Sequence, residues 1–149
     1  MARIIMCGSF KGGVGKTASS WNLAYSLAEM GKRVLAVDFD SQVNLTTCFG
    51  VEDPAAVPVT IGHLKMNRLE DEEMPDPSEF IQSRNGVDFI SSSMMLSAVD
   101  SKLRIDSNNH LISRRQCVNR QCSERWTGIY NNIVIQPSQR LKNAGQHLL

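Results

Sequence analysis

This chain lacks both a disulfide pattern of cysteines and long apolar runs. Its four cysteines among 149 residues lack the spacing of a disulfide framework, which argues against a small secreted domain held by disulfides. No apolar stretch approaches the ~18 residues of a membrane span, and Met1–Cys7 is too short for a secretory signal. The sequence therefore predicts a cytoplasmic protein of about one domain with no membrane span.

Neither sign of charge is in large excess, since the net charge is +1, but the signs are unevenly distributed. Residues 1–102 carry 9 Lys or Arg and 13 Asp or Glu, a net charge of −4, whereas residues 103–149 carry 7 and 2, a net charge of +5. A basic tail can contact nucleic acid, or it can be a solvated or unpacked segment. The second interpretation is favoured, because no motif or interleaved aromatics accompany the basic residues.

The most informative segment is residues 10–17, Phe-Lys-Gly-Gly-Val-Gly-Lys-Thr, which lies between a short apolar run and an amphipathic helix pattern. Glycines can take positive φ and bring backbone N–H groups onto phosphate oxygens. Lys16 can reach the β- and γ-phosphates, and the Thr17 hydroxyl can ligate Mg²⁺. The residues expected to bind the nucleotide are Gly12, Gly13, Val14, Gly15, Lys16 and Thr17.

The alternative for this segment is a glycine turn with a purely structural role. Phe10 stands where the usual phosphate-loop pattern begins with glycine. Nucleotide binding is nevertheless favoured, because a chance turn would seldom come with a preceding strand, a following helix and acidic residues downstream.

Apolar patterning predicts alternating strands and helices. Strands are expected at 3–7, 33–38 and 87–90, with a further strand signature at 129–135. Helices are expected at 17–30, 61–68, 76–82 and 92–104. The first strand should be buried with Cys7 as a small apolar residue, and the second should be a central parallel strand.

Two carboxylates lie at the carboxyl end of the second predicted strand, where ligands collect in open parallel sheets. Asp38 and Asp40 would suit Mg²⁺ ligation or the positioning of an attacking water, together with the Thr17 hydroxyl. Alternatively, Asp40 and Asn44 make only turn and cap hydrogen bonds.

These segments together resemble the ParA/Soj/MinD family of deviant Walker-A ATPases, nearer its ParA branch. The resemblance rests on residues 11–17, on residues 37–46 (Val-Asp-Phe-Asp-Ser-Gln-Val-Asn-Leu-Thr) and on residues 87–93 (Val-Asp-Phe-Ile-Ser-Ser-Ser). It covers about the first 104 residues. It implies an α/β fold with a P-loop NTPase-like parallel sheet flanked by helices, and a DNA, plasmid or chromosome partitioning function that uses ATP and Mg²⁺.

The resemblance also implies roles for single residues. Lys11 would cross a dimer interface to the partner's nucleotide, as an arginine finger does. Asp40 would orient or activate the hydrolytic water, and Asp38 would support the Mg²⁺ shell. Such proteins form homodimers through ATP, bind non-specific DNA and respond to a partner protein that stimulates hydrolysis. An iron–sulfur cluster, as in related nitrogenase proteins, is discounted because Cys117 and Cys122 do not have that arrangement.

The chain departs from the family at Ala18 and Ser41 and, above all, in its tail. The closest candidate for the family's acid-terminated Walker-B strand is 130–136, in which Gln136 would replace the acid and impair hydrolysis. Residues 1–104 are therefore interpreted as the N-terminal part of a ParA-like domain that is incomplete at its C-terminus. Residues 105–149 are interpreted as a frame-shifted or, alternatively, diverged basic tail. The competing functions are a non-enzymatic nucleic-acid or partner-binding module and a non-functional relic.

Overall fold

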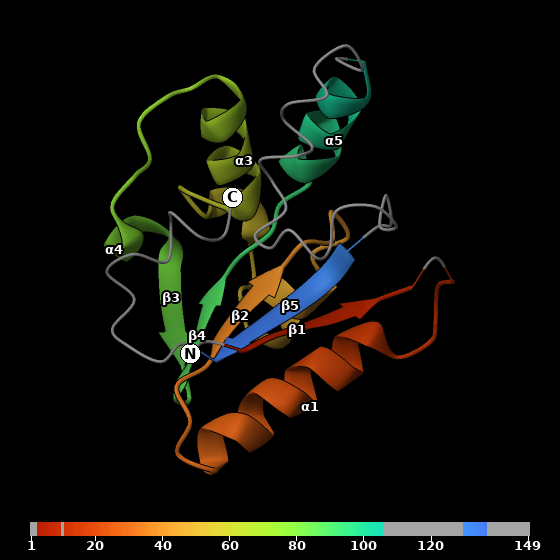
Figure 1. Cartoon of the computed structure of the whole chain (residues 1–149), viewed down its shortest axis with the longest axis vertical. Helices are drawn as coiled ribbons and strands as arrows, with labels where there is room; N and C mark the ends of the chain where they lie inside the picture. The colour runs from red at the N-terminus through yellow and green to blue at the C-terminus, as the bar shows by residue number, and fades with distance from the viewer. Residues whose placement is uncertain (1–2, 10, 106–129, 137–149) are drawn as a thin grey trace.

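The computed structural model describes residues 3–9, 11–105 and 130–136, in which helices lie on both sides of one sheet (Figure 1). The elements in chain order are β1 (Arg3–Gly8), α1 (Lys16–Glu29), β2 (Leu35–Asp38), α2 (Asn44–Cys48), the 3-10 turn η1 (Pro54–Ala56), α3 (Ile61–Leu69), α4 (Pro77–Phe80), β3 (Ile81–Arg84), β4 (Val87–Ile90), α5 (Met95–Ile105) and β5 (Tyr130–Gln136). The predicted α/β class is confirmed.

The sheet has the strand order β1-β5-β2-β4-β3 and is mixed, not wholly parallel. β2 and β4 pair in parallel, whereas β5 is antiparallel to both β1 and β2. β3 and β4 form an antiparallel hairpin. Its turn residues Asn85 and Gly86 have φ of 50° and 80°, as a tight hairpin turn requires. β1, β2 and β4 therefore run in one direction, and β3 and β5 in the other.

The two faces of β2 enter two separate cores, because side chains alternate along a strand. The core against α1 contains the buried residues Ala24, Val34, Ala36, Leu45, Phe49, Val87 and Phe89. The core against α3 contains Leu35, Val37, Ile61, Leu64, Phe80, Ile90 and Leu96. All four residues of β2 are buried, which confirms the expected central strand.

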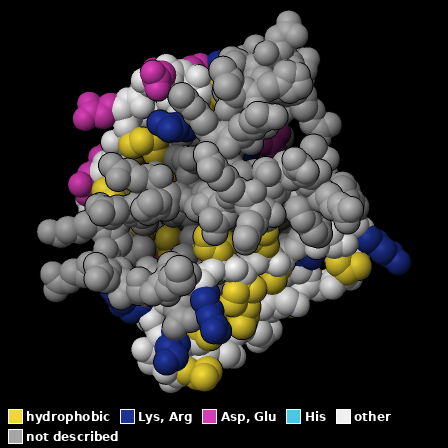
Figure 2. All heavy atoms as spheres, viewed as in Figure 1, with side chains coloured by type: hydrophobic (Ala, Val, Ile, Leu, Met, Phe, Trp, Pro, Cys, Tyr) yellow, Lys and Arg dark blue, Asp and Glu magenta, His cyan; other side chains and the backbone are white. Residues whose placement is uncertain are grey.

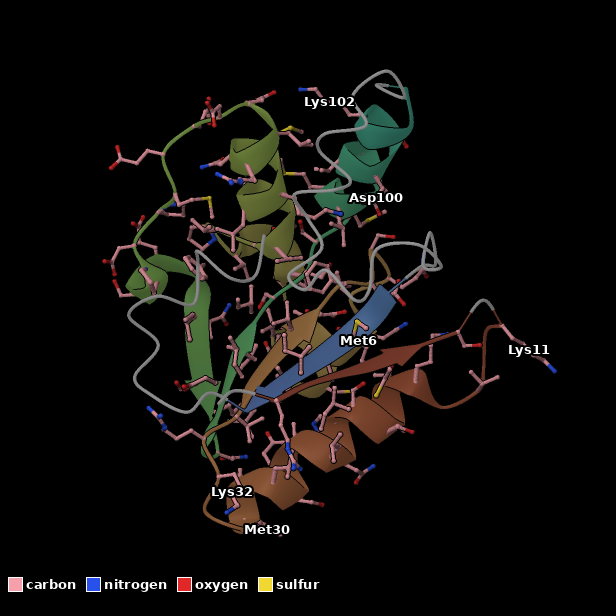
Figure 3. All side chains as sticks on the ribbon, viewed as in Figure 1. Met6, Lys11, Met30, Lys32, Asp100 and Lys102 are labelled. Carbon is pink, nitrogen blue, oxygen red and sulfur yellow. The ribbon has the colours of Figure 1, made fainter. Side chains whose placement is uncertain are left out.

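β1 is not the buried strand that its apolar sequence predicts. It is the outermost strand in the sheet order, so only one of its edges pairs with a described strand. Ile4 and Met6 are 47% and 43% exposed, and Cys7 is half-buried rather than buried. Figure 3 shows Met6 on the face of the strand that α1 does not cover, and Figure 2 shows hydrophobic side chains at the surface on this side of the molecule.

The predicted helix at 76–82 ends early. Asp76 caps α4 by accepting a hydrogen bond from the backbone N–H of Ser78, and Glu79 bonds back to the Asp76 N–H. The chain then leaves the helix after Phe80, because residues 81–84 pair with β4 in the hairpin. Tertiary pairing here overrides the local helical pattern.

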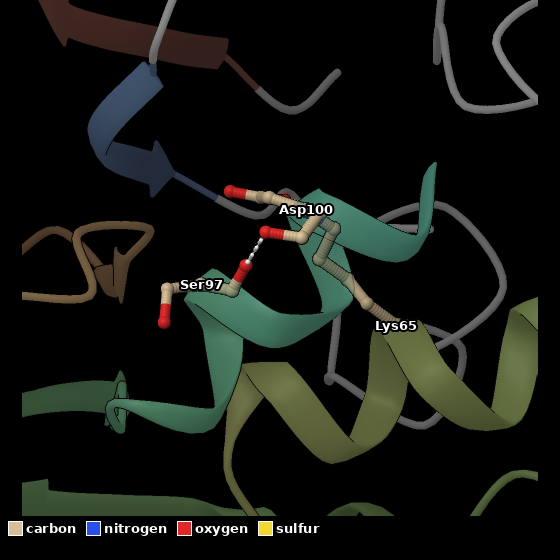
Figure 4. Close-up of polar contacts among 4 residues, drawn as sticks. Lys65, Ser97 and Asp100 are labelled. Atoms are coloured by element: carbon tan, nitrogen blue, oxygen red, sulfur yellow. Dashed lines mark hydrogen bonds and ion pairs between the residues drawn. The ribbon is translucent and has the colours of Figure 1, made fainter. Parts of the chain in front are cut away.

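α3 and α5 lie side by side over the second core. Lys65 of α3 donates to Asp100 of α5 at 2.6 Å, which ties the two helices together (Figure 4). α3 begins and ends within a residue of the predicted 61–68. α5 begins at Met95 and not at residue 92, because the three serines before it make loop hydrogen bonds that are described below.

β5 covers the strand predicted near 129–136. The remainder of the predicted tail, 106–129 and 137–149, lies outside the described residues, so its basic and cysteine residues stay matters of prediction. Among the helices that the structure describes, none is long and apolar enough to pass through a membrane.

Candidate nucleotide-binding site

The glycine-rich loop follows the carboxyl end of β1 and leads directly into the first turn of α1. Gly13 and Gly15 have φ of 71° and 79°, in the left-handed region that favours glycine. A Cβ added at either of these positions, or at Gly12, would meet nothing within 4 Å, so the loop faces open space. The first amides of α1 have no partner within the helix and carry its positive dipole end. The loop therefore has the conformation of an anion-binding nest.

The two lysines of the loop differ in orientation. The Lys16 Nζ donates to the backbone carbonyl of Lys11 at 3.0 Å and so lies over its own loop. The Lys11 side chain is exposed and projects away from the body of the protein (Figure 3). Thr17, in the first turn of α1, is half-buried. Lys16 and Thr17 thus lie at the loop, whereas Lys11 reaches outward.

Asp38, the last residue of β2, is only 1% exposed. Its Oδ1 accepts the Asp40 N–H at 3.1 Å, and its Oδ2 accepts the Thr46 N–H at 2.8 Å and the Thr46 hydroxyl at 2.7 Å. Burial raises the pKa of Asp38 to about 6, although the hydrogen bonds from Thr46 and Asp40 oppose that shift. The carboxylate therefore organises the loop that follows β2.

This shift predicts a pH-dependent stability. The pKa of Asp38 is about 6 in the folded protein, compared with 3.8 for an aspartate in an unfolded chain. The folded state therefore binds this proton more tightly than the unfolded state does. The associated stability is present at low pH and is lost as pH rises through 6. We expect the free energy of unfolding to increase by about 1 kcal/mol from roughly pH 7 to pH 5. Urea unfolding of wild type and Asp38→Asn at both pH values tests this expectation. The variant should lose the increase in the free energy of unfolding between pH 7 and pH 5. An equal increase in the two proteins would show that other titratable groups cause it.

Asp40 lies two residues beyond the strand and is half-buried. Its Oδ1 accepts the Gln42 N–H at 3.0 Å, and its carbonyl accepts the Val43 N–H at 2.9 Å. These bonds form a tight turn before α2, as the alternative interpretation of Asp40 expected.

Val43 holds this loop in a strained conformation. It is the residue before α2 and has φ of 53°, which is unfavourable for a β-branched side chain. The strain costs on the order of 1–3 kcal/mol, and a glycine would relieve it at an entropic cost of about 0.5–1 kcal/mol.

We expect Val43→Gly to raise the free energy of unfolding by about 1 kcal/mol. Val43→Ala keeps a Cβ and should give no such gain. Thermal melts of both variants measure the difference, and a Val43→Gly protein that melts below Val43→Ala would contradict the presence of strain.

The loops after β1 and β2 leave the same edge of the sheet, because the two strands run in the same direction with β5 between them. Two strand spacings, about 10 Å, separate them. Gly8 is opposite Tyr130, and Asp38 is opposite Asn132, so the first residues of β5 lie at this edge.

The expected place of Gln136 is therefore wrong. It pairs with Arg3 at the other edge of the sheet, because β5 is antiparallel and its first residues, not its last, meet the carboxyl ends of β1 and β2. Gln136 does not occupy the position of an acid beside the glycine-rich loop.

No group of three or more His, Cys, Asp or Glu side chains is arranged as a metal site within the part of the chain that the structure describes. Mg²⁺ in nucleotide sites is held by one or two protein oxygens together with phosphates and waters. Thr17, in the first turn of α1, and Asp40, in the loop after β2, have side-chain oxygens at this edge of the sheet.

The comparison with known families covers nearly the whole chain: a family model described as an AAA domain matches residues 2–139. The chain belongs to this AAA domain family. Sporulation initiation inhibitor protein Soj of Bacillus subtilis is 54% identical over 52 residues, 35% of this chain and 21% of Soj. A probable plasmid-partitioning protein ParA of Thermus thermophilus is 38% identical over 92 residues, 62% of this chain and 26% of that relative. The resemblance to the ParA/Soj/MinD family is confirmed, although this chain spans no more than about a quarter of these two relatives.

A solved structure supports the same assignment for this AAA domain. Cobyrinic acid a,c-diamide synthase from Mycobacterium smegmatis, with a bound ATP analog and magnesium, matches with a TM-score of 0.56 at 27% identity. The match covers 70% of this chain and 41% of that one.

Two residues of the site were not predicted from the sequence. Thr46 was noted only as the end of a motif, yet its hydroxyl accepts the backbone N–H of Ser92 at 2.9 Å while it donates to Asp38. No local pattern could reveal this contact, because Ser92 is 46 residues further along the chain.

Proposed function

We propose that this chain binds ATP together with Mg²⁺ at the loop between β1 and α1. The observation that carries the proposal is the open glycine loop at a strand's carboxyl end, with Gly13 and Gly15 in the left-handed region and Lys16 at the first position of a 14-residue helix. Backbone amides, the Lys16 ammonium and the helix dipole would together bind a triphosphate. The bound ATP analog in the Mycobacterium smegmatis relative supports the same ligand class.

Bound Mg²⁺ would offset phosphate charge at the same edge of the sheet. The Thr17 hydroxyl, in the first turn of α1, is suited to contact the ion directly. Asp40 would hold a water of its shell, or the attacking water. Asp38 would support the Mg²⁺ shell indirectly, by holding the Asp40 loop, because both of its oxygens already accept hydrogen bonds from Asp40 and Thr46.

The biological role that we propose is DNA, plasmid or chromosome partitioning in the cytoplasm, supported by the similarity to Soj and ParA. The exposed Lys11, which points away from its own loop, would contact the nucleotide of a second copy in a homodimer. In this proposal the homodimer binds non-specific DNA, and a partner protein stimulates its ATP hydrolysis.

Hydrolysis is expected to be slow. Between the two loops of the site the sheet edge is formed by residues 130–132 of β5, Tyr-Asn-Asn, which contain no carboxylate. Neutral side chains cannot supply the negative charge that would hold Mg²⁺ and its waters.

Titration of fluorescent ATP into the purified full chain, with Mg²⁺ and then with EDTA, tests the proposal. Saturable binding that unlabelled ATP displaces is expected. A chain that is folded by circular dichroism and binds no ATP in either condition would overturn the proposal.

A further inference from the structure

A buried chain of hydrogen bonds joins the loop that carries Asp40 to the end of β4. Asp38 Oδ2 accepts the Thr46 hydroxyl at 2.7 Å, and the same hydroxyl oxygen accepts the Ser92 N–H at 2.9 Å. Thr46 and Ser92 are both fully buried. The single hydroxyl of Thr46 therefore donates to one strand end and accepts from another.

The far end of this connection is itself held firmly. The carbonyl of Ser91 accepts the Ile61 N–H at 2.9 Å, and the Ser93 hydroxyl lies 3.0 Å from the Thr60 hydroxyl, which caps α3. The Ser92 hydroxyl has no hydrogen-bond partner among the described residues, so the connection to Thr46 passes through the Ser92 backbone amide.

The near end carries Asp40. Asp38 receives the Asp40 N–H on one oxygen and both Thr46 donors on the other, so it spans the turn between them. Within that turn, Asp40 bonds to Gln42 and Val43, and Val43 is strained. A turn that contains a strained residue needs an external anchor to keep one geometry.

We propose that the Thr46 hydroxyl is a positioning group for Asp40: through Asp38 and the Ser92 amide it holds the Asp40 loop at a fixed place beside the phosphate loop. This inference rests on the proposed binding of ATP and Mg²⁺. Thr46 does not touch the ligand; it sets where Asp40 meets the metal's water shell. Loss of the Thr46 hydroxyl should weaken the effect of Mg²⁺ on ATP affinity and leave metal-free binding of ATP by the glycine loop unchanged.

The test compares full-length wild type with Thr46→Val, which removes the hydroxyl and keeps the branched shape. The measured quantity is the ratio of ATP affinities with Mg²⁺ and with EDTA. We expect Thr46→Val to reduce this ratio by about fivefold or more, as a lost coupling between two ligands would, with ATP affinity in EDTA within about twofold of wild type. Thr46→Ser, which keeps the hydroxyl, should restore the ratio.

Thr47→Val is the matched control, because the one described bond of the Thr47 hydroxyl is to the carbonyl of Val43, the residue before α2, at 3.0 Å. It should leave the ratio unchanged. If Thr46→Val does not fold, Thr46→Cys replaces it, and the weaker thiol donor should give an intermediate ratio.

Two results would overturn the inference: a folded Thr46→Val or Thr46→Cys protein with the wild-type ratio, or one that loses ATP binding equally with and without Mg²⁺, which indicates a structural role alone. Failure of the wild type to bind ATP would instead overturn the proposed function.

Discussion

Replacement of Lys16 by alanine is expected to reduce ATP affinity by about 100-fold. The ammonium would contact the phosphates, and a charge-assisted hydrogen bond contributes about 1.5–3 kcal/mol. A loss of about 2.7 kcal/mol corresponds to a factor of about 100 in the dissociation constant. The glycine loop and the helix dipole would account for the residual binding.

The structure indicates that this variant should fold normally. Lys16 is half-buried at the start of α1, and its one described side-chain bond is to the exposed carbonyl of Lys11. Removal of such a bond should change the free energy of unfolding by less than about 0.5 kcal/mol. A loss of ATP binding at an unchanged melting temperature would therefore report on the ligand site.

Lys32→Ala is the matched control, because Lys32 is an exposed lysine that lies beyond the other end of α1 (Figure 3). It removes the same charge from the protein and should leave ATP affinity unchanged. Fluorescent-ATP titration of the two variants separates the loss of a contact at the glycine-rich loop from the loss of one positive charge elsewhere on the protein. A Lys16→Ala protein with wild-type affinity would contradict nucleotide binding at this loop.

The parts of this fold that the sequence predicts are those that depend on neighbouring residues. The run Val34–Val37 is apolar and buried, and most of it lies in β2 (Leu35–Asp38). Gly13 and Gly15, just before Lys16, adopt the left-handed conformations that the proposed phosphate loop needs. Both features can be recognised from a few consecutive residues.

The sequence-based predictions that the structure corrects depend instead on residues far apart in the chain. β1 looks like a buried strand, but its exposure depends on its place beside β5, which comes more than 120 residues later in the chain. The direction of β5 decides which of its ends meets the site, and no periodicity encodes direction. The expected support of the Mg²⁺ shell by Asp38 stays a prediction, and the burial and hydrogen bonds that hold its oxygens could not be predicted from the sequence alone. Local patterns predict elements; pairing between distant segments decides their neighbours.

The other large effect concerns Phe49, which follows α2 and is 1% exposed. Its ring stacks on Phe89 of β4 with centroids 4.6 Å apart, and it also contacts Tyr25 of α1 at 5.9 Å. One side chain thus joins the helix on one face of the sheet, a central strand and the segment that carries the Asp40 loop.

Phe49→Ala is expected to lower the free energy of unfolding by about 3–5 kcal/mol, through lost burial and the cavity left behind. That is a large part of the roughly 5–15 kcal/mol typical of a domain. Urea denaturation measures it, with Met94→Ala as a control, because Met94 is 79% exposed and its truncation should cost less than about 0.5 kcal/mol.

The position of Phe49 also predicts which region responds first to this loss. The Phe49 N–H bonds to the Leu45 carbonyl, so the ring anchors the α2 end of the loop while Thr46 and Asp38 anchor its start. Hydrogen exchange in Phe49→Leu, which should stay folded at a cost below about 1.5 kcal/mol, should therefore speed up at Asp40 and Thr46 before it does in β3 or α3. Uniform acceleration across the sheet would show that Phe49 stabilises the domain as a whole and does not act on the loop in particular.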